Sequence, residues 1–116
     1  MTTIDALAAR QLAAYNAGDL DAFVACYHPD VVVWEGEAVT VRGRDALRDR
    51  YVALFEAGGF GATVPARLTE GAHCVDLEAW WREDPESGER TGGRLLVRYT
   101  LQGDHIGAVQ FLLDPE

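Results

Sequence analysis

The chain contains no lysine, and all ten of its basic residues are arginines. Without lysine the protein cannot form a Schiff base with a carbonyl substrate or use a lysine as general base. Its single serine, Ser87, lies in a Pro-Glu-Ser-Gly turn, where a buried nucleophile is not expected. Cys26 and Cys74 do not form a Cys-x-x-Cys pair and lie in apolar segments. We therefore expect two buried thiols, with a disulfide or a reactive thiol as the alternative.

Histidine and positive charge are also scarce. The three histidines show no metal-ligand spacing, and we expect neither a metal nor a cofactor. The formal net charge of −9 argues against nucleic-acid binding, which needs clustered basic residues. No run approaches the roughly 18 apolar residues of a membrane span, and no secretory signal is visible. We expect a cytoplasmic protein that does not contact a membrane, and the arginine, alanine, glycine and valine usage suggests a bacterial origin.

The N-terminal part of the sequence has the apolar periodicity of helices and residues that favour helix starts and stops. Thr3 can cap a first helix, whose apolar residues recur at helical spacing. A second, short helix is predicted from an N-cap at Asp19, with Tyr27 on its apolar face. Pro29 cannot continue that helix, and the β-branched and aromatic residues at 31–34 predict a strand.

The rest of the chain is predicted to be mainly β, with one more helix. A turn at Glu35-Gly36-Glu37 leads to a short return strand, and a third helix covers about residues 46–57. Pro65 lies in a strand over about 63–69 and places that strand at a sheet edge or bulge. Further strands are expected over about 74–82, 94–101 and 106–113. Helices followed by a long antiparallel sheet make this an α+β fold.

Alternation along the last three strands predicts two different sheet faces. The outer face should carry a mixed set of residues, Asp76 and Glu78 among them. Such a face is typical of a subunit interface, and we expect a homodimer through it. The residues expected in that interface are Trp80, Leu96, Arg98 and Leu112. The inner face, which the helices should cover, is assigned the apolar set Val75, Leu77, Ala79, Trp81, Leu95, Val97, Tyr99, Leu101, Val109, Phe111 and Leu113.

Four segments carry a recognisable pattern. They are Tyr-Asn-Ala-Gly-Asp-Leu-Asp-Ala-Phe at 15–23, Tyr-His-Pro-Asp-Val-Val-Val at 27–33, Val-Arg-Gly-Arg-Asp-Ala-Leu-Arg at 41–48 and Gln-Gly-Asp-His-Ile at 102–106. Together they resemble the nuclear transport factor 2-like superfamily, which includes SnoaL-like cyclases and ketosteroid isomerases. The resemblance implies a single domain over residues 1–116, a cystatin-like, cone-shaped half-barrel of three helices packed on a curved sheet. It also implies a pocket at the open end, and dimers through the outer sheet face are common in such proteins.

Glu35 is the candidate catalytic residue. By the resemblance it occupies the position of the general-base carboxylate of ketosteroid isomerases, and strand alternation places it on one face with Val31 and Val33. A carboxylate in an apolar cone loses hydration, which strengthens it as a base. The tyrosine and second acid of the isomerases correspond to Gln11 and Val97 here. An enolate would therefore lack strong donors, and true steroid isomerase activity is not expected. The alternative is that Glu35 is a solvated turn residue.

Two functions remain open on the sequence. The first is a cofactor-independent isomerase, cyclase or dehydratase that uses Glu35 on a small hydrophobic carbonyl substrate. The second is a non-catalytic dimer that binds a small apolar ligand or a protein partner. The residues expected around the ligand are Gln11, Tyr15, Tyr51, Trp81, Val97, Tyr99 and Phe111. The aromatic members of this set can equally be core residues, and the glutamine can be a helix-flank residue.

Overall fold

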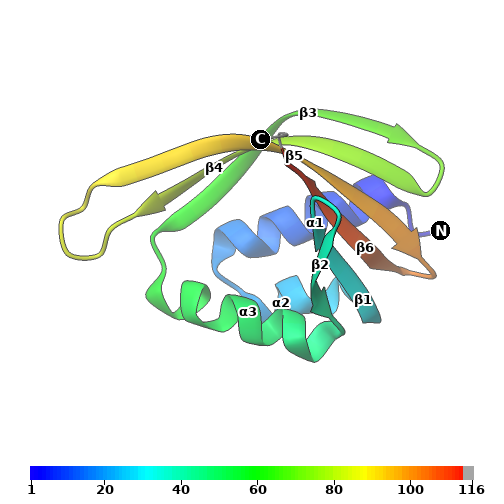
Figure 1. Ribbon diagram of the computed structural model, residues 1–116, viewed down its shortest axis with the longest axis horizontal. Helices are drawn as coiled ribbons and strands as arrows, with labels where there is room; N and C mark the ends of the chain where they lie inside the picture. The colour runs from blue at the N-terminus through cyan, green and yellow to red at the C-terminus, as the bar shows by residue number, and fades with distance from the viewer. Residues whose placement is uncertain (114–116) are drawn as a thin grey trace.

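A six-stranded sheet curves over three helices in the computed structural model, which describes residues 1–113 (Figure 1). The helices lie on the concave side of the sheet. They are α1 (Ile4–Ala17), α2 (Leu20–Ala25) and α3 (Arg44–Ala57). The strands are β1 (Tyr27–Glu35), β2 (Ala38–Arg42), β3 (Phe60–Glu70), β4 (His73–Glu83), β5 (Arg90–Gln102) and β6 (His105–Leu112).

The strand order across the sheet is β2-β1-β6-β5-β4-β3. Neighbouring strands run antiparallel except β1 and β6, which are parallel. The predicted α+β fold with a curved, open sheet is therefore confirmed, and this parallel pair is its one departure from an antiparallel sheet. The exception arises because the β4–β5–β6 meander, and not a hairpin with β1, sets the direction of β6.

The first two helices begin at the predicted capping residues. The side chains of Thr3 and Asp19 accept a hydrogen bond from the amide three residues later, at 3.4 and 3.1 Å. Gly18 ends α1 in the left-handed conformation, with φ of 70°. The second helix is shorter than predicted, because Tyr27 already belongs to β1 and pairs with Ile106 of β6. Sheet pairing thus replaces the last turn of that helix.

β3 is an edge strand, as Pro65 predicted. The register between β3 and β4 shifts between Thr63 and Ala66, so Pro65 lies in an irregular stretch of the ladder. A proline has no amide hydrogen, and this is the kind of place where its absence breaks no sheet hydrogen bond.

The alternation of β4 is the reverse of the prediction. Asp76, Glu78 and Trp80 pair with Val97, Leu95 and Gly93 and share their inner face. Trp81 therefore lies on the outer face, with Val75, Leu77 and Ala79, and Trp80 is not an outer-face residue. The prediction failed because both faces of β4 carry apolar residues, so the two carboxylates alone decided the assignment.

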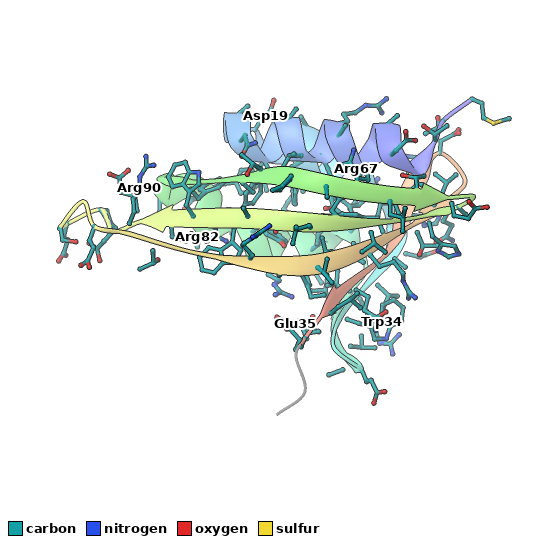
Figure 2. The ribbon with its side chains drawn as sticks, turned by 90° about the horizontal axis from the view of Figure 1, so that it is seen from above. Asp19, Trp34, Glu35, Arg67, Arg82 and Arg90 are labelled. Carbon is teal, nitrogen blue, oxygen red and sulfur yellow. The ribbon has the colours of Figure 1, made fainter. Side chains whose placement is uncertain are left out.

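The buried carboxylate of Asp76, which is 1% exposed, is neutralised by Arg67 of β3. Nε and Nη2 of Arg67 donate to its two oxygens at 2.6 and 2.9 Å. Nη1 of Arg67 donates to the carbonyl of Asp5 at 3.3 Å, and Figure 2 shows Arg67 beside α1. One arginine thus links β3, β4 and α1, and gives a buried charge the partner that it requires.

The two consecutive tryptophans of β4 each cover a glycine of a neighbouring strand. Trp80 lies against Gly93 of β5 on the inner face, and Trp81 lies against Gly61 of β3 on the outer face. A Cβ atom at Gly93 would come within 3.0 Å of the Trp80 ring, and one at Gly61 within 2.7 Å of the Trp81 ring. The missing side chains at these two positions therefore make room for the indole rings.

Candidate functional site

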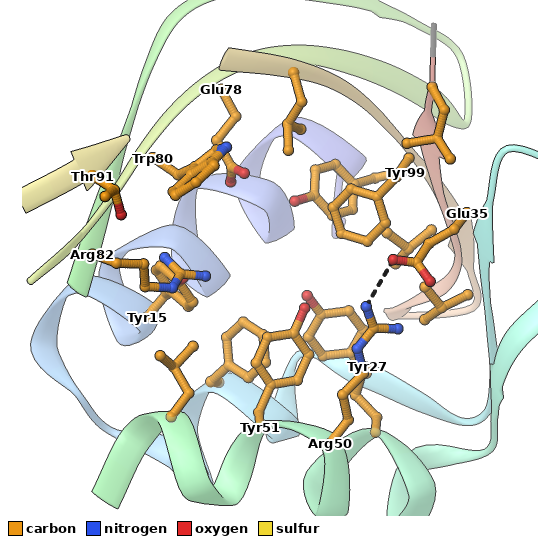
Figure 3. A pocket seen from close by; sticks show the side chains of 18 residues that line it. Tyr15, Tyr27, Glu35, Arg50, Tyr51, Glu78, Trp80, Arg82, Thr91 and Tyr99 are labelled. Carbon is orange, nitrogen blue, oxygen red and sulfur yellow. Dashed lines mark hydrogen bonds and ion pairs between the residues drawn. The ribbon is translucent and has the colours of Figure 1, made fainter. Parts of the chain in front are cut away.

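A cavity of about 550 Å³ lies between the inner face of the sheet and the helices (Figure 3). All four tyrosines of the chain line it, Tyr15, Tyr27, Tyr51 and Tyr99. Its other apolar lining residues are Phe23, Val33, Leu47, Leu54, Trp80, Leu95, Val109, Phe111 and Leu113. Its polar lining residues are Glu35, Arg50, Glu78, Arg82 and Thr91. This size and lining suit a small, mostly apolar ligand.

Gln11 lies behind the cavity wall and joins two of the tyrosines. Its Nε2 donates to the Tyr99 hydroxyl at 3.2 Å, and its Oε1 accepts from the Tyr27 hydroxyl at 3.2 Å. All three side chains are buried. In this arrangement the Tyr99 hydroxyl hydrogen has no acceptor within residues 1–113, so it can be donated to a ligand in the cavity.

Burial keeps the tyrosines protonated. Loss of hydration raises the pKa of Tyr27 and of Tyr99 well above the ordinary value, and it raises the pKa of Tyr51 to about 12. The pKa of Tyr15 is raised by the same cause. Protonated hydroxyls of this kind can donate to a carbonyl oxygen, but they are poor bases.

Glu35 lines the cavity at the end of β1, where it contacts Arg50 of α3. Nη2 of Arg50 donates to Oε1 of Glu35 at 3.2 Å (Figure 3). Nη1 of Arg50 donates to the hydroxyl of Thr40 at 3.0 Å, which holds the guanidinium against β2. The Glu35 side chain is 41% exposed, so it meets both water and the cavity. It is neither a free turn residue nor a fully buried carboxylate.

Glu78 is a second carboxyl group in the cavity, and sequence reasoning placed it on the outer face. It projects from β4 close to Trp80 (Figure 3). Loss of hydration raises the pKa of Glu78, the nearby charge of Asp76 adds to the rise, and Arg82 opposes it. Only the register between β4 and β5 reveals the side of Glu78, because apolar residues occur on both faces of β4.

Arg82 lies on the opposite side of the cavity from Glu35 (Figure 3). Its guanidinium carbon is 5.3 Å from the ring centre of Trp80 and 6.0 Å from the ring centres of Tyr15 and Phe60. The faces of such rings attract a cation. Nη1 of Arg82 donates to the carbonyl of Trp81 at 3.2 Å.

The residues predicted around the ligand divide into two groups. Glu35, Tyr15, Tyr51, Tyr99 and Phe111 line the cavity. The other three do not. Gln11 is 4% exposed and supports two tyrosines from behind, Val97 is fully buried in the core, and Trp81 lies on the far side of the sheet.

The part of the chain that the structure describes contains all three histidines and both cysteines. Among the described residues no group of three or more histidine, cysteine, aspartate or glutamate side chains is arranged to hold a metal ion. Cys26 and Cys74 are buried free thiols, as predicted, and loss of hydration raises the pKa of Cys74 to about 11. No helix within residues 1–113 is long and apolar enough to cross a membrane.

The sequence matches the family model of the SnoaL-like domain over residues 8–108. No curated protein matches the sequence significantly. Similar solved structures include a Δ5-3-ketosteroid isomerase from Mycobacterium sp., with a TM-score of 0.86 at 18% identity over 98% of this chain and 95% of that one.

Two further structures show the same likeness. A Mycobacterium tuberculosis protein in complex with estradiol-17β-hemisuccinate has a TM-score of 0.84 at 13% identity, over 98% of this chain and 95% of that one. An uncharacterised cystatin-fold protein from Novosphingobium aromaticivorans has a TM-score of 0.79 at 22% identity, over 97% of this chain and 99% of that one. At these identities the likeness shows the fold and leaves the activity to the site.

Proposed function

The chain belongs to the SnoaL-like domain family, and from that premise we propose that it is a cofactor-independent enzyme acting on a small hydrophobic carbonyl compound. The reaction is an isomerisation, cyclisation or dehydration in which a carbon next to the carbonyl loses a proton. The observation that carries the proposal is that one and the same cavity combines an aromatic wall, two carboxyl groups and the Tyr99 hydroxyl as a hydrogen-bond donor. These are the groups that such a proton transfer needs.

Glu35 is the proposed general base. Its carboxylate meets both water and the cavity, where it can accept a proton from a bound substrate. Arg50 contacts Oε1, which leaves Oε2 free to accept a proton. A base at this position would act on the part of the substrate nearest the end of β1.

Glu78 is the proposed general acid. Its raised pKa means that it keeps its proton to a higher pH than an exposed glutamate does. Two carboxyl groups in unlike surroundings can divide the roles of base and acid. An isomerisation needs both roles, because a proton leaves one atom and another returns elsewhere.

Tyr99 is the proposed donor to the carbonyl oxygen. Gln11 donates to the oxygen of this hydroxyl and thereby leaves its hydrogen available to the cavity. This donor offsets in part the loss of the tyrosine and acid that Gln11 and Val97 replace. A single neutral donor stabilises an enolate only moderately, so we expect substrates whose protons next to the carbonyl are already acidic.

Exchange of protons on β-tetralone tests this proposal. The compound is a two-ring ketone with acidic protons beside the carbonyl, and in D₂O a general base replaces them with deuterium, which NMR records. We expect the wild-type protein to accelerate this exchange and Glu35→Gln to lower the acceleration by about 100-fold, a usual contribution of a general base. Glu37→Gln is the matched control, because Glu37 is an exposed residue of the adjacent turn.

The outcomes separate the roles of the carboxyl groups. Wild-type exchange in Glu35→Gln would remove Glu35 from the mechanism. Glu78→Gln should have the smaller effect, since exchange alone does not need the acid. A larger loss in Glu78→Gln than in Glu35→Gln would instead assign the base to Glu78.

A non-catalytic dimer that binds an apolar ligand is the second candidate function. The observation that favours a dimer is the outer sheet face, where Leu68, Leu96 and Leu112 are 78%, 44% and 39% exposed. Exposed leucines gathered on one face are typical of an association surface. Binding of β-tetralone without any acceleration of exchange would support this function over the enzyme.

A further inference from the structure

We propose that the ligand of the cavity carries a carboxylate group and that Arg82, with Thr91 beside it, binds that group. The inference rests on the proposed function, because it names the class of substrate for the same cavity. The substrate class is then an aromatic or otherwise flat apolar carbonyl compound with a carboxylate at the end away from Glu35.

The first argument is the balance of charges around the inner face. Arg50 is paired with Glu35 at 3.2 Å, and Arg67 is paired with Asp76 at 2.6 Å. Arg82 is the other arginine of the cavity wall, and within residues 1–113 no carboxylate oxygen lies within 4.0 Å of its guanidinium nitrogens. Its positive charge therefore faces the cavity without an ion pair from the described residues, and the carboxyl group of Glu78 interacts with it only at longer range.

The second argument is how firmly that charge is held. Three aromatic rings surround the guanidinium, at 5.3 Å for Trp80 and 6.0 Å for Tyr15 and Phe60. Within residues 1–113 the group donates one hydrogen bond, to the carbonyl of Trp81 at 3.2 Å. A guanidinium has five N–H donors in a planar fork, so several remain for a ligand, and this fork matches the two oxygens of a carboxylate. An arginine that is already ordered loses less entropy when it binds.

The third argument is the neighbouring polar groups. Thr91 is the cross-strand partner of Arg82, and both line the cavity (Figure 3). Its hydroxyl can donate to the same anion. Glu78 lies on the same face of β4 as Arg82. Donors thus converge on one side of the cavity.

The arrangement also orients the ligand. Arg82 and the Glu35–Arg50 pair lie on opposite sides of the cavity (Figure 3). A carboxylate at Arg82 directs the other end of a flat molecule toward Glu35, the proposed base. The same contact would exclude neutral hydrocarbons from tight binding, since they leave Arg82 without a partner in a partly dry site.

Calorimetric titration with 2-naphthoate and 2-naphthamide at pH 7.5 tests the inference. The two probes have nearly the same shape and differ in charge. We expect the wild-type protein to bind 2-naphthoate at least about tenfold more tightly, the lower end of what a charged hydrogen bond contributes. Arg82→Met should remove this preference and leave the affinity for 2-naphthamide within about threefold. Arg90→Met is the matched control, because Arg90 stacks on Trp81 at 4.1 Å on the outer face.

Any other result of this titration overturns a defined part of the inference. Equal affinity of the wild-type protein for the two probes would overturn the carboxylate inference and leave the cavity and the proposed function standing. A preference that survives Arg82→Met would show that another group recognises the charge. No binding of either probe would overturn the inference, and the exchange of β-tetralone would then decide the proposed function separately. The comparison of probes on the wild-type protein needs no variant, so the test holds even if Arg82→Met does not fold.

Discussion

Glu78 is a partly buried carboxyl group whose protonation is coupled to folding. Its pKa is higher in the folded protein than the ordinary value of 4.5, so the folded state binds the proton more tightly than the unfolded state does. The stability that this contributes is fully present below pH 4.5 and is lost as the pH rises through the folded-state pKa. Glu78→Gln cannot ionise, and its free energy of unfolding should rise relative to the wild type between pH 4 and pH 8.

Urea unfolding of both proteins at the two pH values measures this difference. Glu37→Gln serves as the control, because it removes an exposed carboxylate from a turn and should differ from the wild type equally at both pH values. An equal offset for Glu78→Gln at pH 4 and pH 8 would contradict the partly buried, cavity-facing position of Glu78.

Sequence reasoning identified some of the residues that line the cavity and missed others for a physical reason. Glu35 could be predicted because it resembles the general-base position of ketosteroid isomerases and because strand alternation places it on one face with Val31 and Val33. Tyr99 could be predicted because its strand alternates cleanly. Glu78 could not, because a carboxylate on a strand is normally solvated, and apolar residues on both faces of β4 conceal which face turns toward the cavity. The role of Gln11 depends on two hydroxyls that the sequence separates by many residues.

The ion pair of Arg67 and Asp76 holds three elements together. Asp76→Asn leaves the Arg67 charge with a neutral partner between β3, β4 and α1. Loss of one member of a buried pair is costly, and because the Arg67 side chain is 21% exposed we expect the lower end, about 3 kcal/mol of unfolding free energy. Urea unfolding at pH 7 measures it.

The exposed pair of Arg48 and Asp21 provides the matched control. Their atoms approach to 2.8 Å, but the side chains are 42% and 87% exposed. Asp21→Asn should change the unfolding free energy little, because water screens such a pair. Equal losses in the two variants would mean that Asp76 is solvated in the folded protein.

Elements were predicted well where local signals decide them and poorly where pairing decides them. The capping side chains of Thr3 and Asp19 fix the starts of α1 and α2 from the sequence alone. The end of α2 was misplaced because pairing with β6 draws Tyr27 into the sheet. The two faces of β4 were exchanged for the same kind of reason, since its register with β5 is a long-range property.

At the level of the whole molecule, the outer sheet face is the candidate surface for association of two copies. Leu77, Leu96 and Leu112 lie side by side across β4, β5 and β6. Arg98 lies on the same face, opposite Val75. We expect the wild-type protein to sediment as a dimer through this surface, and Leu96→Arg to sediment as a monomer, because it buries an unpaired charge in the interface.

Sedimentation velocity of the two proteins, with Ala13→Arg as the control, measures the effect. Ala13 is exposed on α1, on the helical side of the molecule, so this variant should remain dimeric. A monomeric wild type, or a Leu96→Arg protein that stays dimeric, would rule out an interface on this face. Trp80 is no longer a member of that interface, because it lies in the cavity.

The opposite orientations of Trp80 and Trp81 give the protein a built-in fluorescent reporter for each side of the sheet. Trp80 lines the cavity, whereas Trp81 and Trp34 lie on the other face, and the chain has no further tryptophan. Replacing Trp34 and Trp81 by phenylalanine leaves an emission signal that responds to what enters the cavity. Replacing Trp80 alone leaves a signal that responds to what covers the sheet. Ligand entry and subunit association can therefore be followed independently, without a label on either partner.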